Sequence, residues 1–229
     1  MRSAEGLQAV VFDMDGVIID SEPIAEHFFT TELRQFGADI QPGDLEATRG
    51  MTRADFWRFI KSKYDLLEPA EYYQASLDVQ KEIDQYTPEL AASGCLELMA
   101  QLRAAGMALG LATSGSRRRT DAVIEILNLQ STFGAVVCGA DVTDGKPHPE
   151  VFLKTAKALS IAPHNCLVVE DAARGIEAAR AAGMVVAGYS GLGVSAEELT
   201  GAHAIIDDFA AVTPGDLRVI WSSGRAARK

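Results

Sequence analysis

The stretch that decides the fold lies near the N-terminus and reads Val10-Val11-Phe12-Asp13-Met14-Asp15-Gly16-Val17. Its apolar run without polar alternation is typical of a parallel strand that is buried on both faces. Two carboxylates at positions i and i+2 follow directly, and then a glycine. Because ligands of open α/β sheets bind at the carboxyl ends of the strands, Asp13 and Asp15 are predicted to lie at such a site. The alternative is a turn in which both acids bond only to the local backbone.

Further apolar runs alternate with amphipathic stretches in the rest of the chain. The predicted strands are residues 7–12, 107–113, 135–138, 166–169 and 184–187, and the predicted helices are 96–104, 118–127, 149–159 and 173–181. The pentapeptide Arg-Ala-Ala-Gly-Met occurs at 103–107 and again at 180–184, each time where a helical pattern ends in Gly and an apolar run begins. This alternation predicts an α/β fold with a Rossmann-like parallel sheet.

Residues 18–90 differ from the rest because they lack strand-like runs. Helices are predicted here over 23–36, 53–64 and 69–83, and these residues carry most of the aromatic side chains. We therefore predict an α/β core domain made of residues 1–17 and 91–229, with an inserted helical cap domain over residues 18–90. The last residues, from 222 on, are predicted to be disordered.

Composition excludes several classes of function. The 229 residues carry a net charge of −11, which disfavours nucleic acid as a partner. The basic residues 117–119 are predicted to form a solvated helix face. The odd count of three cysteines argues against a disulfide framework and a zinc site. No apolar run approaches 18 residues and no signal peptide is visible, so we expect no membrane contact and a cytoplasmic protein.

Three later segments also place polar side chains beyond a predicted strand or on a stiff loop. Thr113-Ser114-Gly115-Ser116 can present a hydroxyl and backbone N–H groups to phosphate oxygens, or can simply cap the next helix. Lys146 lies between Gly145 and a proline, where a fixed positive charge suits phosphate, although a lone lysine is commonly solvated. The pair Glu170-Asp171 ends a strand and suits Mg²⁺, or only favours a helix N-terminus.

The four segments, in this order, resemble the motifs of the haloacid dehalogenase-like phosphohydrolases, in the branch of β-phosphoglucomutases and small sugar-phosphate phosphatases. The resemblance runs from about residue 10 to residue 207. It implies that Asp13 attacks phosphorus and forms an aspartyl phosphate, and that Asp15 acts as acid and base. Thr113 and Lys146 would hold the phosphoryl oxygens, together with backbone N–H groups at Ser114 and Gly115. The metal site implied for Mg²⁺ consists of Asp13, Asp15, Glu170 and Asp171.

The cap is expected from this resemblance to set substrate specificity. Gly50 and Arg53 fall where the branch has a substrate loop, and Arg53 matches an arginine that holds the distal phosphate in the mutase. An exposed charge at the start of a helix is the alternative for Arg53. The mutase has a histidine twelve residues after its nucleophile, where this chain has Ala25.

The function predicted from the sequence is therefore a Mg²⁺-dependent phosphatase acting on a small phosphorylated metabolite of the sugar-phosphate type. A phosphomutase and a catalytically silent phosphometabolite-binding protein remain as alternatives. A monomer is predicted, because the cap must move over the site.

Overall fold

The computed structural model describes residues 6–48, 51 and 53–227. Within this part of the chain, one parallel sheet has six strands in the order β3-β2-β1-β4-β5-β6. The strands are β1 (Ala9–Phe12), β2 (Ala108–Ala112), β3 (Ala135–Val137), β4 (Cys166–Glu170), β5 (Val185–Tyr189) and β6 (Ala204–Ile206). The predicted Rossmann-like α/β fold is confirmed. Its strand order reverses between the neighbouring strands β1 and β4, which is the switch point of the sheet.

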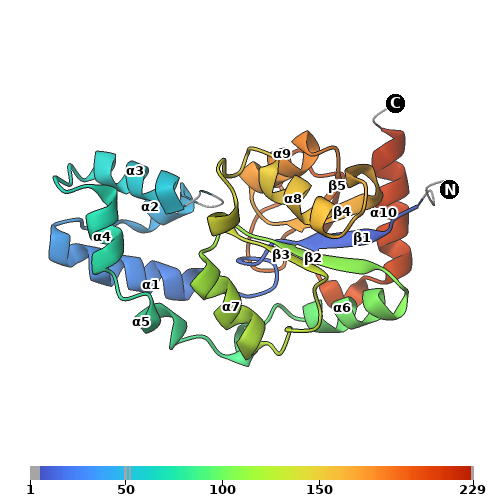
Figure 1. Ribbon diagram of the computed structural model, residues 1–229, viewed down its shortest axis with the longest axis horizontal. Helices are drawn as coiled ribbons and strands as arrows, with labels where there is room; N and C mark the ends of the chain where they lie inside the picture. The colour runs from blue at the N-terminus through green and yellow to red at the C-terminus, as the bar shows by residue number, and fades with distance from the viewer. Residues whose placement is uncertain (1–5, 49–50, 52, 228–229) are drawn as a thin grey trace.

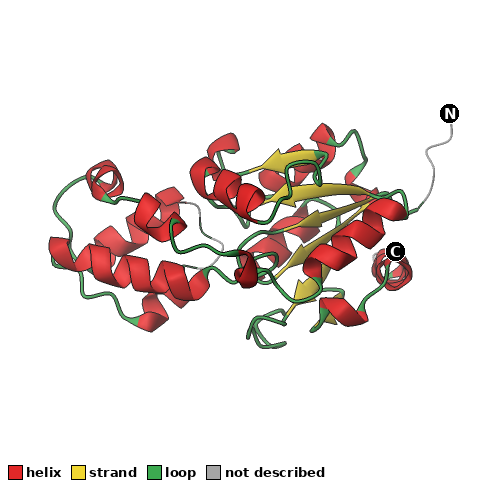
Figure 2. Cartoon of the chain, turned by 90° about the horizontal axis from the view of Figure 1, so that it is seen from below, coloured by secondary structure: helices red, strands yellow, loops and turns green. Residues whose placement is uncertain are grey.

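Helices cover both faces of the sheet (Figures 1 and 2). One face carries α6 (Cys95–Ala104), α7 (Arg117–Ile126) and α10 (Pro214–Ala226), and the other carries α8 (Glu150–Ala158) and α9 (Ala173–Ala181). Alternation along β1 explains both contacts, because Val10 and Phe12 pack into one apolar cluster while Ala9 and Val11 pack into the other. The site at the sheet edge therefore rests on a layer packed from both sides.

The inserted helical segment lies beyond the carboxyl ends of the strands. In Figure 2 the arrowheads mark these ends and point towards the segment. It consists of α1 (Glu22–Leu33), α2 (Pro42–Glu46), α3 (Arg53–Lys63), α4 (Ala70–Ser76) and α5 (Gln80–Ile83). Most of these helices bury their own apolar cluster, in which the rings of Trp57 and Tyr73 stack at 6.1 Å. The part that returns to the sheet is different, because Ile83 and Tyr86 pack into the cluster under the sheet.

Two backbone segments connect the helical part to the sheet, and they pair with each other. The amide of Asp20 donates to the carbonyl of Leu90 at 2.8 Å, and the amide of Ala92 donates to the carbonyl of Ile18 at 2.9 Å. The chain thus leaves the sheet and returns to it at one place. No helix among the described residues is both long enough and apolar enough to cross a bilayer.

The structure corrects the sequence prediction at the ends of several elements. The predicted helix 69–83 is interrupted between α4 and α5. The strand β6 was not predicted, because it is a short edge strand in which only Ile206 is buried and Ile205 is exposed. The predicted disorder from residue 222 is wrong for residues 222–226, since α10 continues to Ala226. Residues 228–229 lie outside the described part of the chain. Trp221 holds α10 in place, because its indole is buried and donates to the carbonyl of His164 at 3.1 Å.

Candidate active site

The register of the sheet brings two predicted acids together at its carboxyl edge. Phe12, the last residue of β1, pairs with Leu111 of β2 and with Val169 of β4. Asp13 follows Phe12 and Glu170 follows Val169, so the two acids lie side by side at the ends of neighbouring strands. Their residues are 6% and 1% exposed, respectively. Parallel pairing has therefore placed two carboxylates in a nearly dry position at the switch point of the sheet.

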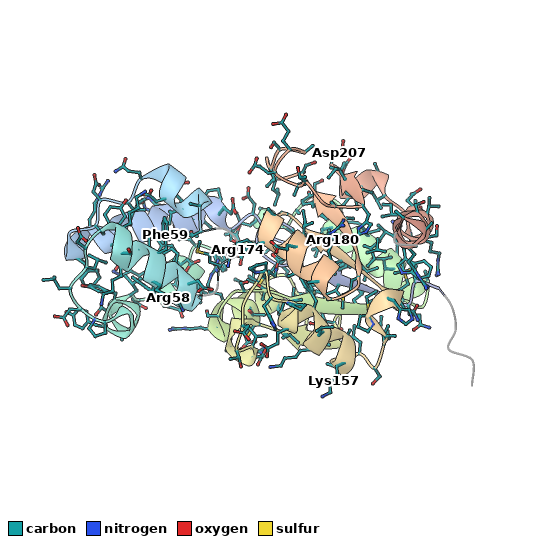
Figure 3. All side chains as sticks on the ribbon, turned by 90° about the horizontal axis from the view of Figure 1, so that it is seen from above. Arg58, Phe59, Lys157, Arg174, Arg180 and Asp207 are labelled. Carbon is teal, nitrogen blue, oxygen red and sulfur yellow. The ribbon has the colours of Figure 1, made fainter. Side chains whose placement is uncertain are left out.

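Lys146 reaches both of these carboxylates from the loop before α8. Its Nζ lies 2.5 Å from Asp13 Oδ1 and 3.2 Å from Glu170 Oε1, and the residue is 1% exposed. Arg174, which Figure 3 labels near the junction of the two parts of the molecule, donates to the carbonyl of Lys146 through Nη2 at 2.6 Å and Nε at 3.1 Å. These bonds fix the loop, so Lys146 is not the solvated surface lysine that the sequence also allowed.

The single positive charge of Lys146 does not neutralise the three acids that lie together at this edge of the sheet. Carboxylate oxygens of Asp13, Glu170 and Asp171 lie within 4.8 Å of one another. Burial raises the pKa of Asp13 although Lys146 opposes it, and burial with the neighbouring Asp13 raises the pKa of Glu170 to about 8. Burial and Glu170 raise the pKa of Asp171 well above its usual range. A further cation is needed if all three are to be ionised at neutral pH.

The same three side chains fit a hard divalent cation. Mg²⁺ prefers oxygen ligands and commonly uses one or two carboxylates. The Oε2 atom of Glu170 is buried and has no hydrogen-bond partner among the described residues, so it retains an unused acceptor. Residues present at the sheet edge therefore match the donor set that Mg²⁺ requires.

Two glycines leave the space that the carboxylates of Asp171 and Glu170 occupy. A Cβ atom on Gly16, whose φ is +75°, would lie 2.0 Å from Asp171 Oδ2. A Cβ atom on Gly175, in the first turn of α9, would lie 1.5 Å from Glu170 Oε1. Neither carboxylate could keep its position beside an alanine at these sites.

Gly175→Ala should therefore damage the site although alanine is the better helix former. Alanine in place of glycine inside a helix normally stabilises by about 0.5–1 kcal/mol. Here the methyl group displaces Glu170, and we expect a loss of about 10-fold or more in kcat/KM, of the size that second-neighbour changes at metal sites produce. Gly215→Ala in α10 is the matched control, because its Cβ would meet only Thr213 Oγ1 at 3.4 Å. Equal activity of the two variants would contradict this account.

The loop after β2 places hydroxyl and backbone groups next to the acids. Thr113 is 1% exposed, and its Oγ1 accepts a hydrogen bond from the amide of Gly115 at 2.9 Å. No described residue accepts its hydroxyl hydrogen, which is therefore available to a ligand oxygen. Ser116 caps α7, because its hydroxyl accepts from the amide of Arg119 at 3.4 Å. Ser116 thus caps the helix. Ser114, Gly115 and Ser116 all line the site.

Asp15 has a partner that the sequence analysis missed. Its Oδ1 accepts from the hydroxyl of Ser21 and lies 3.0 Å from Nη2 of Arg119. Arg119 belongs to the basic run 117–119, and the prediction of a solvated face is wrong for it, since only 14% of its side chain is exposed. The helical periodicity of the sequence could have predicted this burial, because Arg119 lies four residues before the buried Val123 and therefore on the same face of the helix.

A cavity of about 480 Å³ joins these groups to the helical segment. The sheet side contributes Asp13, Asp15, Thr113, Ser114, Gly115, Ser116, Arg119, Lys146, Glu170, Asp171 and Ala172, and the helical side contributes Ser21, Glu22, Ala25, Glu26, Phe29, Gly43, Leu45, Thr48, Met51 and Phe56. Gly50, predicted to bind substrate, lies outside the described residues. Arg53 begins α3, but its side chain also lies outside the description, so both assignments stay predictions.

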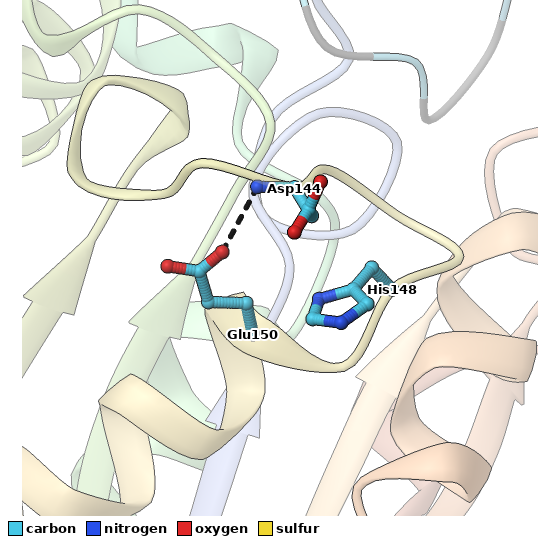
Figure 4. A group of neighbouring side chains, drawn as sticks. All are labelled: Asp144, His148 and Glu150. Carbon is cyan, nitrogen blue, oxygen red and sulfur yellow. Dashed lines mark hydrogen bonds between the residues drawn. The ribbon is translucent and has the colours of Figure 1, made fainter.

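A second acidic cluster lies outside this cavity, in the loop before α8 (Figure 4). It contains Asp144, His148 and Glu150. Glu150 is already engaged, because Oε2 accepts from the amides of Thr143 and Asp144 at 3.0 and 2.9 Å. Those amides, with Lys154 at 2.5 Å from Oε1, lower the pKa of Glu150 to about 2. Glu150 thus joins the start of α8 to the preceding loop.

The family model for haloacid dehalogenase-like hydrolases matches residues 10–189, and the chain belongs to this family. Within it, the β-phosphoglucomutase of Bacillus subtilis (strain 168) is 30% identical over 229 residues, covering 96% of this chain and 97% of that protein.

Two further relatives show the range of activities among similar proteins. The phosphoglycolate phosphatase of Escherichia coli (strain K12) is 31% identical over 206 residues, covering 80% of this chain and 81% of that protein. The crystal structure of β-phosphoglucomutase from Clostridium difficile has a TM-score of 0.86 at 25% identity and covers 96% of this chain and 99% of that one. The recognised branch of β-phosphoglucomutases and sugar-phosphate phosphatases is thereby confirmed.

Proposed function

We propose that this chain is a Mg²⁺-dependent phosphatase that hydrolyses a small phosphorylated metabolite of the sugar-phosphate class through an aspartyl phosphate on Asp13. The observation that carries the proposal is the buried pair of Asp13 and Lys146, 2.5 Å apart, on the wall of a cavity of about 480 Å³. A carboxylate nucleophile needs a nearby positive charge to approach an anionic phosphoryl group. A cavity of this size suits a small ligand.

In the first step, a carboxylate oxygen of Asp13 attacks phosphorus, and the bond from phosphorus to the substrate oxygen breaks. Asp15 gives a proton to the departing alkoxide, which leaves as an alcohol. Lys146 and Thr113 hold the phosphoryl oxygens while charge redistributes over them. The geometry supports these roles because all four side chains line one cavity.

In the second step, Asp15 takes a proton from water, and the resulting hydroxide oxygen attacks phosphorus. The bond between phosphorus and Asp13 then breaks, which releases inorganic phosphate and restores the carboxylate. The residues that would hold Mg²⁺ are Asp13, Glu170 and Asp171, with Asp15 contributing through its backbone. When bound, Mg²⁺ neutralises the charge of the carboxylates and of the phosphoryl group.

Mg²⁺ should raise the melting temperature of the protein in the absence of substrate. A ligand at 100 times its Kd stabilises the folded state by about 2.7 kcal/mol, which is roughly 5–10 °C for a chain of this length. Asp171→Asn should remove most of this shift, because it deletes a buried ligand oxygen. Asp144→Asn, in the exposed cluster of Figure 4, should retain it. Scanning calorimetry with and without Mg²⁺ decides between these outcomes, and an undiminished shift in Asp171→Asn would refute the assignment.

We also propose that residues 18–90 act as a cap domain on a core of residues 1–17 and 91–229. The proposal is supported by the separate apolar cluster of α1, α3 and α4 and by the paired connections at Ile18–Asp20 and Leu90–Ala92. Closure of such a segment excludes bulk water from the reacting groups. Gly50 and Arg53 lie in its substrate loop under this proposal, with Arg53 contacting the part of the substrate far from the phosphoryl group.

A phosphomutase is the second candidate, because the B. subtilis β-phosphoglucomutase matches this chain over nearly its full length. Ala25, which lines the cavity where the mutase has a histidine, favours the phosphatase. The test is phosphate release from a panel of phosphorylated sugars, acids and nucleotides, with and without Mg²⁺. Mg²⁺-dependent release from one substrate class supports the phosphatase. Turnover of β-glucose 1-phosphate without phosphate release, and only with an added bisphosphate, would establish the mutase instead.

A further inference from the structure

Among the described residues that line the cavity, Arg119 is a buried cation that the proposed reaction does not use. It lies in the first turn of α7. Figure 1 shows α7 next to the segment that returns from α5 to the sheet, and a hydrogen bond joins Arg119 to Tyr86 of that segment. Its two basic neighbours are engaged on the surface, since Arg117 pairs with Asp141 and Arg118 donates to Gln80. Arg119 alone turns towards the cavity, and 14% of its side chain is exposed.

The two terminal nitrogens of the Arg119 guanidinium donate hydrogen bonds to the carboxylate of Asp15. Nη2 lies 3.0 Å from Oδ1, and Nη1 lies 3.4 Å from Oδ2. Bonds from two guanidinium nitrogens to the two oxygens fix the rotation of a carboxylate as well as its position, which a lysine cannot do. Ser21 donates to the same Oδ1 and completes the hold. Asp15 is thus oriented by groups from two other parts of the chain.

The other edge of the guanidinium is anchored by the returning segment. Nε donates to the hydroxyl of Tyr86 at 2.9 Å and lies 2.8 Å from Oε1 of Glu82. Tyr86 donates to the same Oε1 at 2.8 Å, and burial raises the pKa of its phenol, so it stays a donor. Glu82 is fully buried, and its Oε2 has no partner among the described residues. A buried carboxylate needs a cation, and the guanidinium of Arg119 supplies it.

We propose that Arg119, anchored by Glu82 and Tyr86, is the positioning residue that orients Asp15 for proton transfer. The inference rests on the proposed function, because it concerns the proton that Asp15 gives to the leaving oxygen and takes from water. A second role, direct binding of the substrate's phosphoryl group by Arg119, predicts a different kinetic pattern. It would raise KM for every substrate, whereas loss of orientation lowers the rate of steps that need the proton.

The test compares two leaving groups in a single turnover with the enzyme in excess. An alkyl phosphate needs a proton on its leaving oxygen, while 2,4-dinitrophenyl phosphate does not. Arg119→Ala should lower the single-turnover rate with the alkyl phosphate by about 100-fold, and that of dinitrophenolate release by less than about 5-fold. Arg119→Lys should recover only part of the alkyl-phosphate rate. Arg118→Ala is the matched control and should behave as wild type.

Glu82→Gln keeps the inference testable if Arg119→Ala does not fold. It should cause a smaller loss with the same preference for the alkyl phosphate, and Arg119→Ala/Glu82→Gln should be no slower than Arg119→Ala, because both act through one path. Equal losses with both substrates, a rise in KM alone, or full activity of Arg119→Lys would overturn the inference. A wild-type protein that cleaves neither substrate would instead overturn the proposed function, and the role of Arg119 with it.

Discussion

Asp13→Asn should abolish turnover, with a loss of at least about 10⁴-fold in kcat, because it removes the atom that attacks phosphorus in the proposed mechanism. The amide has nearly the same shape as the carboxylate but is a very poor nucleophile. Phosphate release measured with a substrate found in the panel gives the rate. Acid-quenched wild-type protein should contain a phosphoryl group on an aspartate, and the variant should contain none.

The fold of Asp13→Asn should survive the change. Asp13, Glu170 and Asp171 are buried beside a single described lysine, and the raised pKa of Asp13 means that the site disfavours its charge. A neutral side chain therefore relieves crowding of negative charge, and we expect a melting temperature without Mg²⁺ close to that of the wild type. Circular dichroism melting separates this loss of chemistry from a loss of structure.

Asp144→Asn provides the control for the chemistry, because it changes the same side chain in an exposed cluster outside the cavity. Its turnover should equal that of the wild type. Turnover that is unchanged in Asp13→Asn would refute the aspartyl-phosphate mechanism. Loss of turnover in both variants would show that the assay does not measure a reaction specific to the cavity.

The site could be predicted from the sequence where chemistry directly follows a buried strand. Asp13 and Glu170 were each predicted at the end of a buried strand. The sheet places them side by side, because the parallel register of β1 and β4 brings the two strand ends together. Lys146 could not be placed by the same rule, since it lies on a loop. Only the structure shows that Arg174 holds the carbonyl of Lys146 and that its Nζ is buried against both acids.

Arg119 shows what local patterns miss. Its partner Asp15 is 104 residues away in the chain, and the anchors Glu82 and Tyr86 are 37 and 33 residues away, so no spacing rule joins them. Three arginines in a row suggested a solvated face, although the helix period turns the third one inward. The ends of the inserted helices were imprecise for a related reason, because packing within that segment's own cluster decides where they stop.

Lys146→Met should be the most damaging change to stability at the site. Removing one partner of a buried ion pair leaves the other charges uncompensated, which costs about 3–5 kcal/mol. For a chain of this length that corresponds to roughly 6–20 °C in melting temperature. Methionine keeps the length and apolar stem of the side chain, so the loss reports the charge and not a cavity. Turnover should also fall, by about 10³-fold, because the phosphoryl oxygens lose a cation.

Lys154→Met is the matched control, because Lys154 pairs with Glu150 at 2.5 Å on an exposed part of α8. Exposed pairs contribute about 0–1 kcal/mol, so its melting temperature should move little and its turnover should not change. The stability lost in Lys146→Met should shrink in saturating Mg²⁺, since a cation held by Asp13 and Asp171 neutralises the charges that Lys146 no longer balances. A loss that is the same with and without Mg²⁺ would mean that Lys146 and the metal do not act on the same carboxylates.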